Sequence, residues 1–338
     1  MFFTFNQKTV LFASAIACSV CGITQAQPDT QEIAINFAAY VGEAEFACGE
    51  SYKEVGTAKS TITPKDFRFY VSNLALIDEA GNAVPLKLSQ DGKWQYQNTA
   101  LLDFEDGTKS CDNGTAEINT TVKGKIPAGD YQSLQFTLGI PQKLNHSDAA
   151  IAQSPLNLTS MWWNWQGGYK FLRVDLETAE AIANVGDSHS NNSHSNSTSG
   201  QAAHGHSNST QTGNSQISHQ DTGTTSGHGE EAISSNAYLI HLGSTGCSAS
   251  AQSNLFSCAN PNRVQVMLED FNAKDDVVIA DLGELLAQSN LSTNQANTPN
   301  GCMSSPEDGD CMPIMQNLNL SSPADSTGDA SQYFFFVE

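Results

Sequence analysis

Short segments in which apolar and polar residues alternate dominate the chain from residue 31 to residue 176. A period of two places every second side chain on one face of a strand, so these segments predict half-buried β-strands separated by turns. The same pattern resumes after a long polar gap. The predicted strands cover residues 33–37, 67–71, 134–138, 170–174, 237–242, 264–268 and 277–281.

No amphipathic helix of ordinary length competes with these strands, although residues 281–287 predict one short helical turn. Many short strands with frequent turns are typical of an all-β protein. The sequence therefore predicts an antiparallel β-sandwich with long loops. We expect a single domain over residues 27–320, followed by a C-terminal tail over 321–338.

The polar gap, residues 186–230, consists almost entirely of Ser, Gly, Asn, Thr, Gln and His. So few apolar side chains cannot compensate for the entropy lost on ordering, and we predict a disordered His-rich insert within the one domain. Imidazoles bind copper, zinc and nickel, which predicts weak accessory metal binding; the alternative is a polar linker that gained histidines by repeat expansion. The insert's six histidines are His189, His194, His204, His206, His219 and His228.

The N-terminus has the pattern of a secretory signal peptide over residues 1–26. Lys8 precedes an apolar run over residues 9–17, and a cleavage site with small residues ends at Ala26. A lipid anchor at Cys18 is the less favoured alternative, because the run before it is short and the later site is good. We expect a periplasmic or secreted protein. No other segment reaches the roughly 18 apolar residues of a transmembrane helix.

The charge balance narrows the range of partners. The 338 residues include 36 acidic and 15 basic ones, for a net charge of −21, and the Lys and Arg residues are not clustered. Binding to phosphate backbones requires such clusters, so nucleic acid is excluded as a partner.

Export also favours disulfides. After signal cleavage an even number of cysteines remains, and in an oxidising compartment such cysteines pair. Local spacing favours Cys247 with Cys258 and Cys302 with Cys311, which leaves Cys48 with Cys111. Six cysteines allow 15 pairings, so the connectivity stays open.

Familiar catalytic motifs are missing from the sequence: it has no nucleophile elbow, phosphate-binding glycine loop, His-Glu-x-x-His or Cys-x-x-Cys-His. We predict a protein that is not an enzyme and holds no organic cofactor. Asp103 and Glu105 fit a solvated or hydrogen-bonded strand end. Packing is favoured over soft-metal ligation for three methionines near the C-terminus, which are Met303, Met312 and Met315.

Two histidines lie outside the insert. His241 lies in a segment apolar on both faces and needs a buried partner, whereas His146 follows a predicted strand in a polar loop. Each taken alone predicts a structural histidine. Between them, Met161, Trp163 and Trp165 would share one face of a strand, either as sheet packing or as an aromatic platform.

Several ordered motifs together resemble the MbnP family, also called metallo-mystery pair four-Cys motif proteins. The motifs are DFRFYVSN (66–73), LLDF (101–104), LGIP (138–141), NH (145–146), WNWQGGYKF (163–171), HLGSTGC (241–247), GCMS (301–304) and DC (310–311). The likeness runs from about residue 33 to residue 320. The His-rich insert is the main departure from it.

The resemblance implies a secreted β-sandwich that binds copper as Cu(I) for acquisition, storage or delivery. Its implied partner is a MauG-like di-haem cytochrome c of the MbnH type, which oxidises a tryptophan to kynurenine. Carried onto this sequence, the ligands are His146 and His241 and the modified residue is Trp163 or Trp165. The four-Cys label fits the cysteines at 247, 258, 302 and 311. The alternative is a secreted ligand-binding or adhesion sandwich without a specific metal site.

Overall fold

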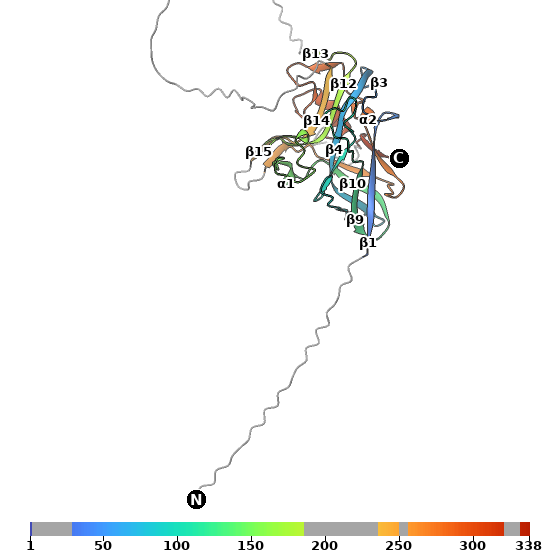
Figure 1. Cartoon of the computed structure of the whole chain (residues 1–338), viewed down its shortest axis with the longest axis vertical. Helices are drawn as coiled ribbons and strands as arrows, with labels where there is room; N and C mark the ends of the chain where they lie inside the picture. Colours follow the sequence, from blue (N-terminus) through green and yellow to red (C-terminus); the bar gives the residue numbers. More distant parts are fainter. Residues whose placement is uncertain (2–28, 186–235, 250–255, 321–331) are drawn as a thin grey trace, which may run out of the picture.

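The computed structural model describes residues 1, 29–185, 236–249, 256–320 and 332–338, which form an all-β fold built on two large sheets (Figure 1). The predicted signal peptide, apart from Met1, and the His-rich insert lie outside the described residues. Every strand predicted from alternation lies within an observed strand. The predicted all-β fold class is therefore confirmed.

The smaller sheet has the central order β21-β18-β1-β9-β6, and β2 pairs with the end of β1. Its strands are β1 (Thr30–Val41), β2 (Ala44–Glu45), β6 (Lys87–Leu88), β9 (Thr121–Pro127), β18 (Val277–Asp281) and β21 (Phe335–Val337).

The larger sheet has the central order β17-β10-β4-β12-β14-β20, with β3, β5, β7, β8 and β11 attached along it. Its members are β3 (Tyr52–Val55), β4 (Ser60–Asp78), β5 (Ala83–Pro85), β7 (Gln95–Tyr96), β8 (Thr99–Asp103), β10 (Tyr131–Leu138), β11 (Trp162–Asn164), β12 (Gly168–Thr178), β14 (Ala237–Gly243), β17 (Val264–Leu268) and β20 (Gly301–Cys302).

Aromatic side chains fill the space between the sheets. Phe37 of β1 meets Phe69 of β4 and Phe136 of β10 edge-on, with ring centroids 6.1 and 5.9 Å apart. Phe335 of β21 adds contacts of 5.4 Å to Phe69 and 5.1 Å to Phe136. Burial of this apolar area is the main stabilising term of the sandwich.

Two details of the fold differ from the sequence prediction. The sandwich is not wholly antiparallel, because β1 pairs with β18 and β14 pairs with β20 in parallel. The C-terminal segment, expected as a tail outside the domain, supplies β21, which pairs with β18 and buries Phe334 and Phe335. Its apolar run Tyr-Phe-Phe-Phe-Val at 333–337 was the signal for a strand.

Smaller elements lie around the sheets. β13 (Ala183–Val185) pairs with β19 (Thr293–Gln295), and β15 (Thr245–Ala249) pairs with β16 (Phe256–Asn260). The helices are short: α1 (Gln142–Asn145), the 3-10 helix η1 (Thr159–Met161), α2 (Leu282–Leu286) and α3 (Cys311–Asn317). None of the helices in the described ranges is long and apolar enough to cross a bilayer.

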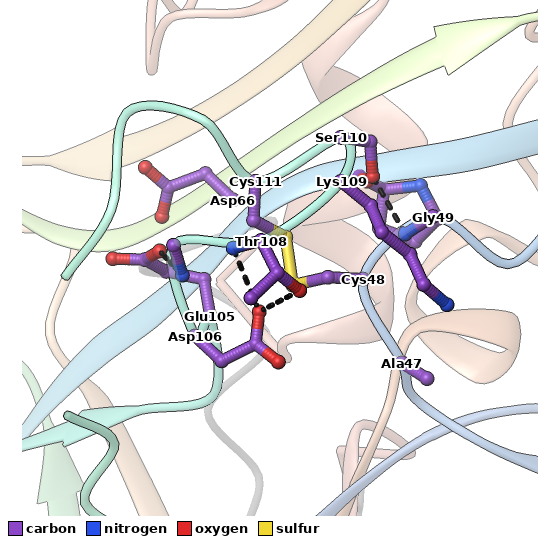
Figure 2. Close-up of a disulfide and its surroundings, with 12 residues drawn as sticks. Ala47, Cys48, Gly49, Asp66, Glu105, Asp106, Thr108, Lys109, Ser110 and Cys111 are labelled. Atoms are coloured by element: carbon purple, nitrogen blue, oxygen red, sulfur yellow. Dashed lines mark hydrogen bonds between the residues drawn. A yellow bond between two sulfur atoms is a disulfide. The ribbon is translucent and has the colours of Figure 1, made fainter. Parts of the chain in front are cut away.

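Among the described residues three disulfides form: Cys247–Cys258 and Cys302–Cys311, which local spacing favoured, and Cys48–Cys111, the pair that remained. Cys48–Cys111 ties the loop after β8 to the chain after β2 (Figure 2). Beside it the Gly49 amide donates to Ser110 Oγ, and the Thr108 amide and hydroxyl both donate to Asp106 Oδ1. This fastened loop carries Glu105 over the larger sheet near Asp66.

Candidate metal centre

The face of the larger sheet that points away from the sandwich core carries a buried ion network. Its members are charged or titratable side chains. Those joined in ion pairs have side chains that are at most 12% exposed. They are Asp66 and Arg68 of β4, Asp103 of β8, Glu105, Lys170, Arg173 and Asp175 of β12, and His241 of β14.

Strand register assembles this network. Asp103 lies opposite Arg68, Arg68 lies opposite Arg173, and Arg173 lies opposite His241, so four adjacent strands form one row. Asp66 and Asp175 are paired in the next row of the same face. Alternation along β4 therefore puts Phe67 and Phe69 into the sandwich core and Asp66 and Arg68 on the other face.

Opposite charges are matched within the network. Asp66 accepts from Arg68 Nε at 2.8 Å and pairs with Arg173 Nε at 3.1 Å. Asp175 accepts from Arg173 Nε at 2.9 Å and contacts His241 Nε2 at 2.7 Å. Buried charges require such partners, because an unpaired ion inside a protein is costly.

Burial shifts the titration of several members. Desolvation raises the pKa of Asp103 to about 8 and lowers the pKa of Lys170 to about 8. Desolvation also lowers the pKa of His241, against the opposing effect of its hydrogen bond to the Asp175 carboxylate, which favours the neutral imidazole. Asp103 and Glu105, expected at a solvated or hydrogen-bonded strand end, are 1% and 0% exposed, so the solvated alternative was wrong.

His146 occupies a different setting at the end of α1. A Cβ at Gly168 would lie 2.4 Å from the Asn145 carbonyl oxygen, and Gly168 has φ +79°, so glycine there permits the chain before His146 to approach the start of β12. His146 follows this one-turn helix, where the sequence predicted a loop. β15 lies on the same side of the molecule as α1 (Figure 1).

Contacts on both ring nitrogens and on the ring face fix the imidazole of His146. It stacks on Phe256 with centroids 4.3 Å apart, and Phe256 meets Trp165 edge-on at 5.8 Å. Nδ1 lies 3.3 Å from the Trp165 carbonyl oxygen. Because a carbonyl only accepts, Nδ1 carries the proton and Nε2 keeps its lone pair. Desolvation lowers the pKa of His146, which favours the neutral ligand form.

Nε2 of His146 faces sulfur. It lies 3.6 Å from Sγ of Cys258 and accepts from Asn145 Nδ2 at 3.3 Å. The ligand atoms of His146, Cys247 and Cys258 all lie within 4.8 Å of one another. We call His146, Trp165, Phe256 and the Cys247–Cys258 disulfide the aromatic cluster. The Nε2 lone pair of His146, held by a single weak hydrogen bond from Asn145 and oriented by the hydrogen bond at Nδ1, fits the requirements of a metal-binding histidine.

The three residues predicted to share a strand face do not. Met161 ends η1 and is fully buried, Trp163 lies half-buried in β11, and Trp165 lies beyond the strand and is 62% exposed. The turn at Gly167 and Gly168 begins before the alternation can continue. The Trp163 ring packs over Gly243, where a Cβ would lie 2.5 Å from Trp163 Cζ3.

The structure does not bring His146 and His241 together. Asn145 contacts Gly168 near the start of β12, whereas His241 lies opposite Arg173, five residues further along. At about 3.3 Å per residue, Gly168 and Arg173 are about 17 Å apart along β12. The Trp163–Trp165 segment reaches the surroundings of both histidines. The Trp165 carbonyl lies beside His146, and the Trp163 ring covers Gly243, two residues from His241 on one face of β14.

Other candidates have separate outcomes. Met315 packs against the core and Met303 is half-buried, but Met312 is 59% exposed, so packing was wrong for Met312. The six histidines of the insert lie outside the described residues. Sequence reasoning missed Asn145 and Phe256, the neighbours of His146. The Asn145-His146 pair was visible as a motif, but Phe256 is 110 residues away and gave no signal.

Comparisons with known proteins agree with this architecture. The MbnP family model matches residues 30–304. The solved structure of MbnP from Methylosinus trichosporium superposes with a TM-score of 0.64 at 25% identity, covering 91% of this chain and 98% of that one. A search of curated proteins finds no match. Because the family model spans most of the chain, and the solved structure covers nearly all of it, this chain belongs to the MbnP family.

Proposed function

We propose that the chain is a secreted or periplasmic copper-binding protein that takes part in copper acquisition, storage or delivery. Family membership supports the link to copper. The carrying observation is that the short segment Trp163–Trp165 touches the surroundings of both predicted ligands, His146 through Trp165 and His241 through Gly243. An oxidised tryptophan in this segment would add a donor beside a neutral imidazole.

The proposed maturation converts one tryptophan to kynurenine. Two equivalents of hydrogen peroxide each supply one oxygen atom and each leave one water, so the indole C2–C3 bond breaks and both carbons become carbonyls. Hydrolysis by one water then releases the former C2 as formate. The product carries an aromatic amine and a ketone. A MauG-like di-haem cytochrome c of the MbnH type is the proposed oxidant, acting on peroxide. The exposed indole of Trp165 is accessible to such a partner, whereas Trp163 is half-buried.

The residues in place fit copper in its soft, low-coordinate state. Copper(I) prefers nitrogen and sulfur donors, and the unprotonated Nε2 of His146 is such a donor. Nε2 of His241 is hydrogen-bonded to the Asp175 carboxylate, and such a bond orients the imidazole of a metal-binding histidine. The two imidazoles lie in separate surroundings, His146 in the aromatic cluster and His241 in the buried ion network. We therefore propose His146 as the primary ligand and keep His241 as a predicted one.

Mass spectrometry and copper titration test this function together. The protein is produced with and without a di-haem partner, and the peptide containing residues 162–165 is sequenced by fragmentation. We expect loss of one carbon and gain of one oxygen at Trp165 or Trp163, with tight Cu(I) binding only in the modified protein. The His146→Ala variant should lose this binding, whereas the distant exposed variant Lys59→Ala should keep it.

Unmodified tryptophan in protein matured with its partner, together with equal copper affinity in both preparations, would contradict the proposal. It would favour the alternative, a secreted ligand-binding or adhesion sandwich whose tryptophans only pack. The proposed absence of enzymatic activity is tested on the same copper-loaded samples by following oxygen or peroxide consumption, which should match that of free protein.

A further inference from the structure

We propose that the Cys247–Cys258 disulfide is a latent metal site, and that its reduction creates a His146, Cys247 and Cys258 centre for Cu(I). This centre needs no kynurenine, so it extends beyond the proposed function while sharing His146 with it. The three ligand atoms already lie within 4.8 Å of one another, and Nε2 of His146 is 3.6 Å from Sγ of Cys258.

The surrounding contacts orient the donors before metal arrives. Phe256 and Cys258 are two residues apart in β16 and share a face, so the imidazole that stacks on Phe256 has its Nε2 beside Cys258. The proton on Nδ1 is held by the Trp165 carbonyl. Metal binding has to displace one weak contact, the 3.3 Å hydrogen bond from Asn145.

The donor set favours Cu(I) over zinc. Two thiolates and one imidazole are soft ligands, and three of them complete the coordination shell of a low-coordinate Cu(I). Structural zinc sites normally use four protein ligands. Among the described residues, the group of potential His, Cys, Asp and Glu ligands at this place has only these three members.

This disulfide is also the most accessible of the three. Cys258 is half-buried at the surface, and Cys247 borders an open hollow of about 290 Å³ lined by Asn164, Gln166 and Gly246. The four cysteines of the other two disulfides are at most 5% exposed. Thiol–disulfide exchange requires an attacking thiolate to reach a sulfur, so exposure selects this bond.

The fold around the site is expected to survive its opening. β15 and β16 stay paired through Thr245 with Asn260, Ser248 with Ser257 and Ala249 with Phe256.

Reduction of the Cys247–Cys258 bond consumes one dithiol. The two thiols of the reductant become a disulfide, the Cys247–Cys258 bond breaks, and the two electrons and two protons released form two cysteine thiols. Cu(I) then replaces both thiol protons, which pass to solvent.

The test uses the full chain made without a di-haem partner, so that its tryptophans are unmodified. A phosphine reductant is applied in limiting amount and removed, and iodoacetamide mapping identifies the free thiols. We expect Cys247 and Cys258 to be labelled first. Competition with a chromophoric Cu(I) chelator should show one Cu(I) bound to reduced protein and none, at equal chelator, to oxidised protein.

Two variants locate the site. Cys247→Ser/Cys258→Ser should abolish the additional Cu(I) binding. His146→Phe keeps both thiols and the stack on Phe256, and should weaken Cu(I) binding more than about 100-fold, because loss of a ligand exceeds the effect of losing a supporting residue. If the double variant fails to fold, His146→Phe decides.

Three outcomes would overturn the inference: another disulfide opening first, reduced protein binding Cu(I) no tighter than oxidised protein, or reduced His146→Phe binding as tightly as the parent chain. None of them affects kynurenine-dependent copper binding, which is measured on the oxidised, partner-matured protein. Conversely, absence of kynurenine would contradict the proposed function and leave this site intact.

Discussion

The two histidines outside the insert lie in contrasting environments. His241 belongs to the buried ion network, where its Nε2 is already held by Asp175 and its neighbours are charged. His146 belongs to the aromatic cluster, half-exposed, with its Nε2 lone pair beside sulfur and an exposed indole nearby. The comparison indicates that charge pairing fixes the side chains of the ion network, whereas the aromatic cluster retains a nitrogen donor, Nε2 of His146, that can bind a metal.

The largest expected effect comes from removing the anion shared by two guanidinium groups of the network. Asp66→Ala leaves Arg68 and Arg173 without their common partner, and breaking a buried pair costs about 3–5 kcal/mol. Denaturant unfolding followed by circular dichroism measures this loss. Glu54→Ala, which removes the exposed pair with Lys59, should cost less than about 1 kcal/mol. Equal losses would mean that the network is not a major stabilising feature.

Matched substitution of the two histidines sharpens the contrast. His241→Leu removes a partner of a buried carboxylate, with an expected loss of about 1–3 kcal/mol in unfolding free energy. His146→Leu, at the surface, should change it by about 0.5 kcal/mol. Thermal and urea unfolding of both variants decide. A larger loss at His146 would reverse the proposed division between a structural and a reactive region.

The pH dependence of stability tests the charge state of the network. Burial raises the pKa of Asp103 to about 8 from 3.8, so the folded protein favours the protonated carboxyl. Its contribution is fully present below pH 3.8 and is lost as the pH rises through about 8. Asp103→Asn mimics the neutral form. As the pH rises from 5 to 8, its unfolding free energy should therefore increase by about 1 kcal/mol or more relative to that of the parent chain. A constant difference across that range would contradict a protonated Asp103.

The smallest effect is expected at the exposed end of the aromatic cluster. Trp165→Phe should change the unfolding free energy by no more than about 0.5 kcal/mol, because the indole is 62% exposed. The same variant should lower the fluorescence fraction quenched by iodide, since it removes an accessible indole. A large loss of stability would show that Trp165 supports the fold.

Strand alternation was sufficient to predict the all-β fold, because a period of two is a signal of local sequence, as where Phe67 and Phe69 flank Arg68 in β4. The ion network was not predictable, since it depends on the register of four strands that are distant in sequence. Local spacing favoured the Cys247–Cys258 pair, which the structure places between the paired strands β15 and β16. Its contact with His146 depends on the packing of α1 against β16, which no local pattern encodes.

The order of the smaller sheet has a kinetic consequence. β1 lies beside β18, and β18 is completed by β21, so strands from the two extremes of the described chain form one layer. Contacts between such distant segments close late and make folding slow. Phe335 of β21 fills the aromatic core between the sheets, so the sandwich cannot consolidate until β21 has been synthesised. The segments made before it are thus expected to stay unconsolidated until that strand is available.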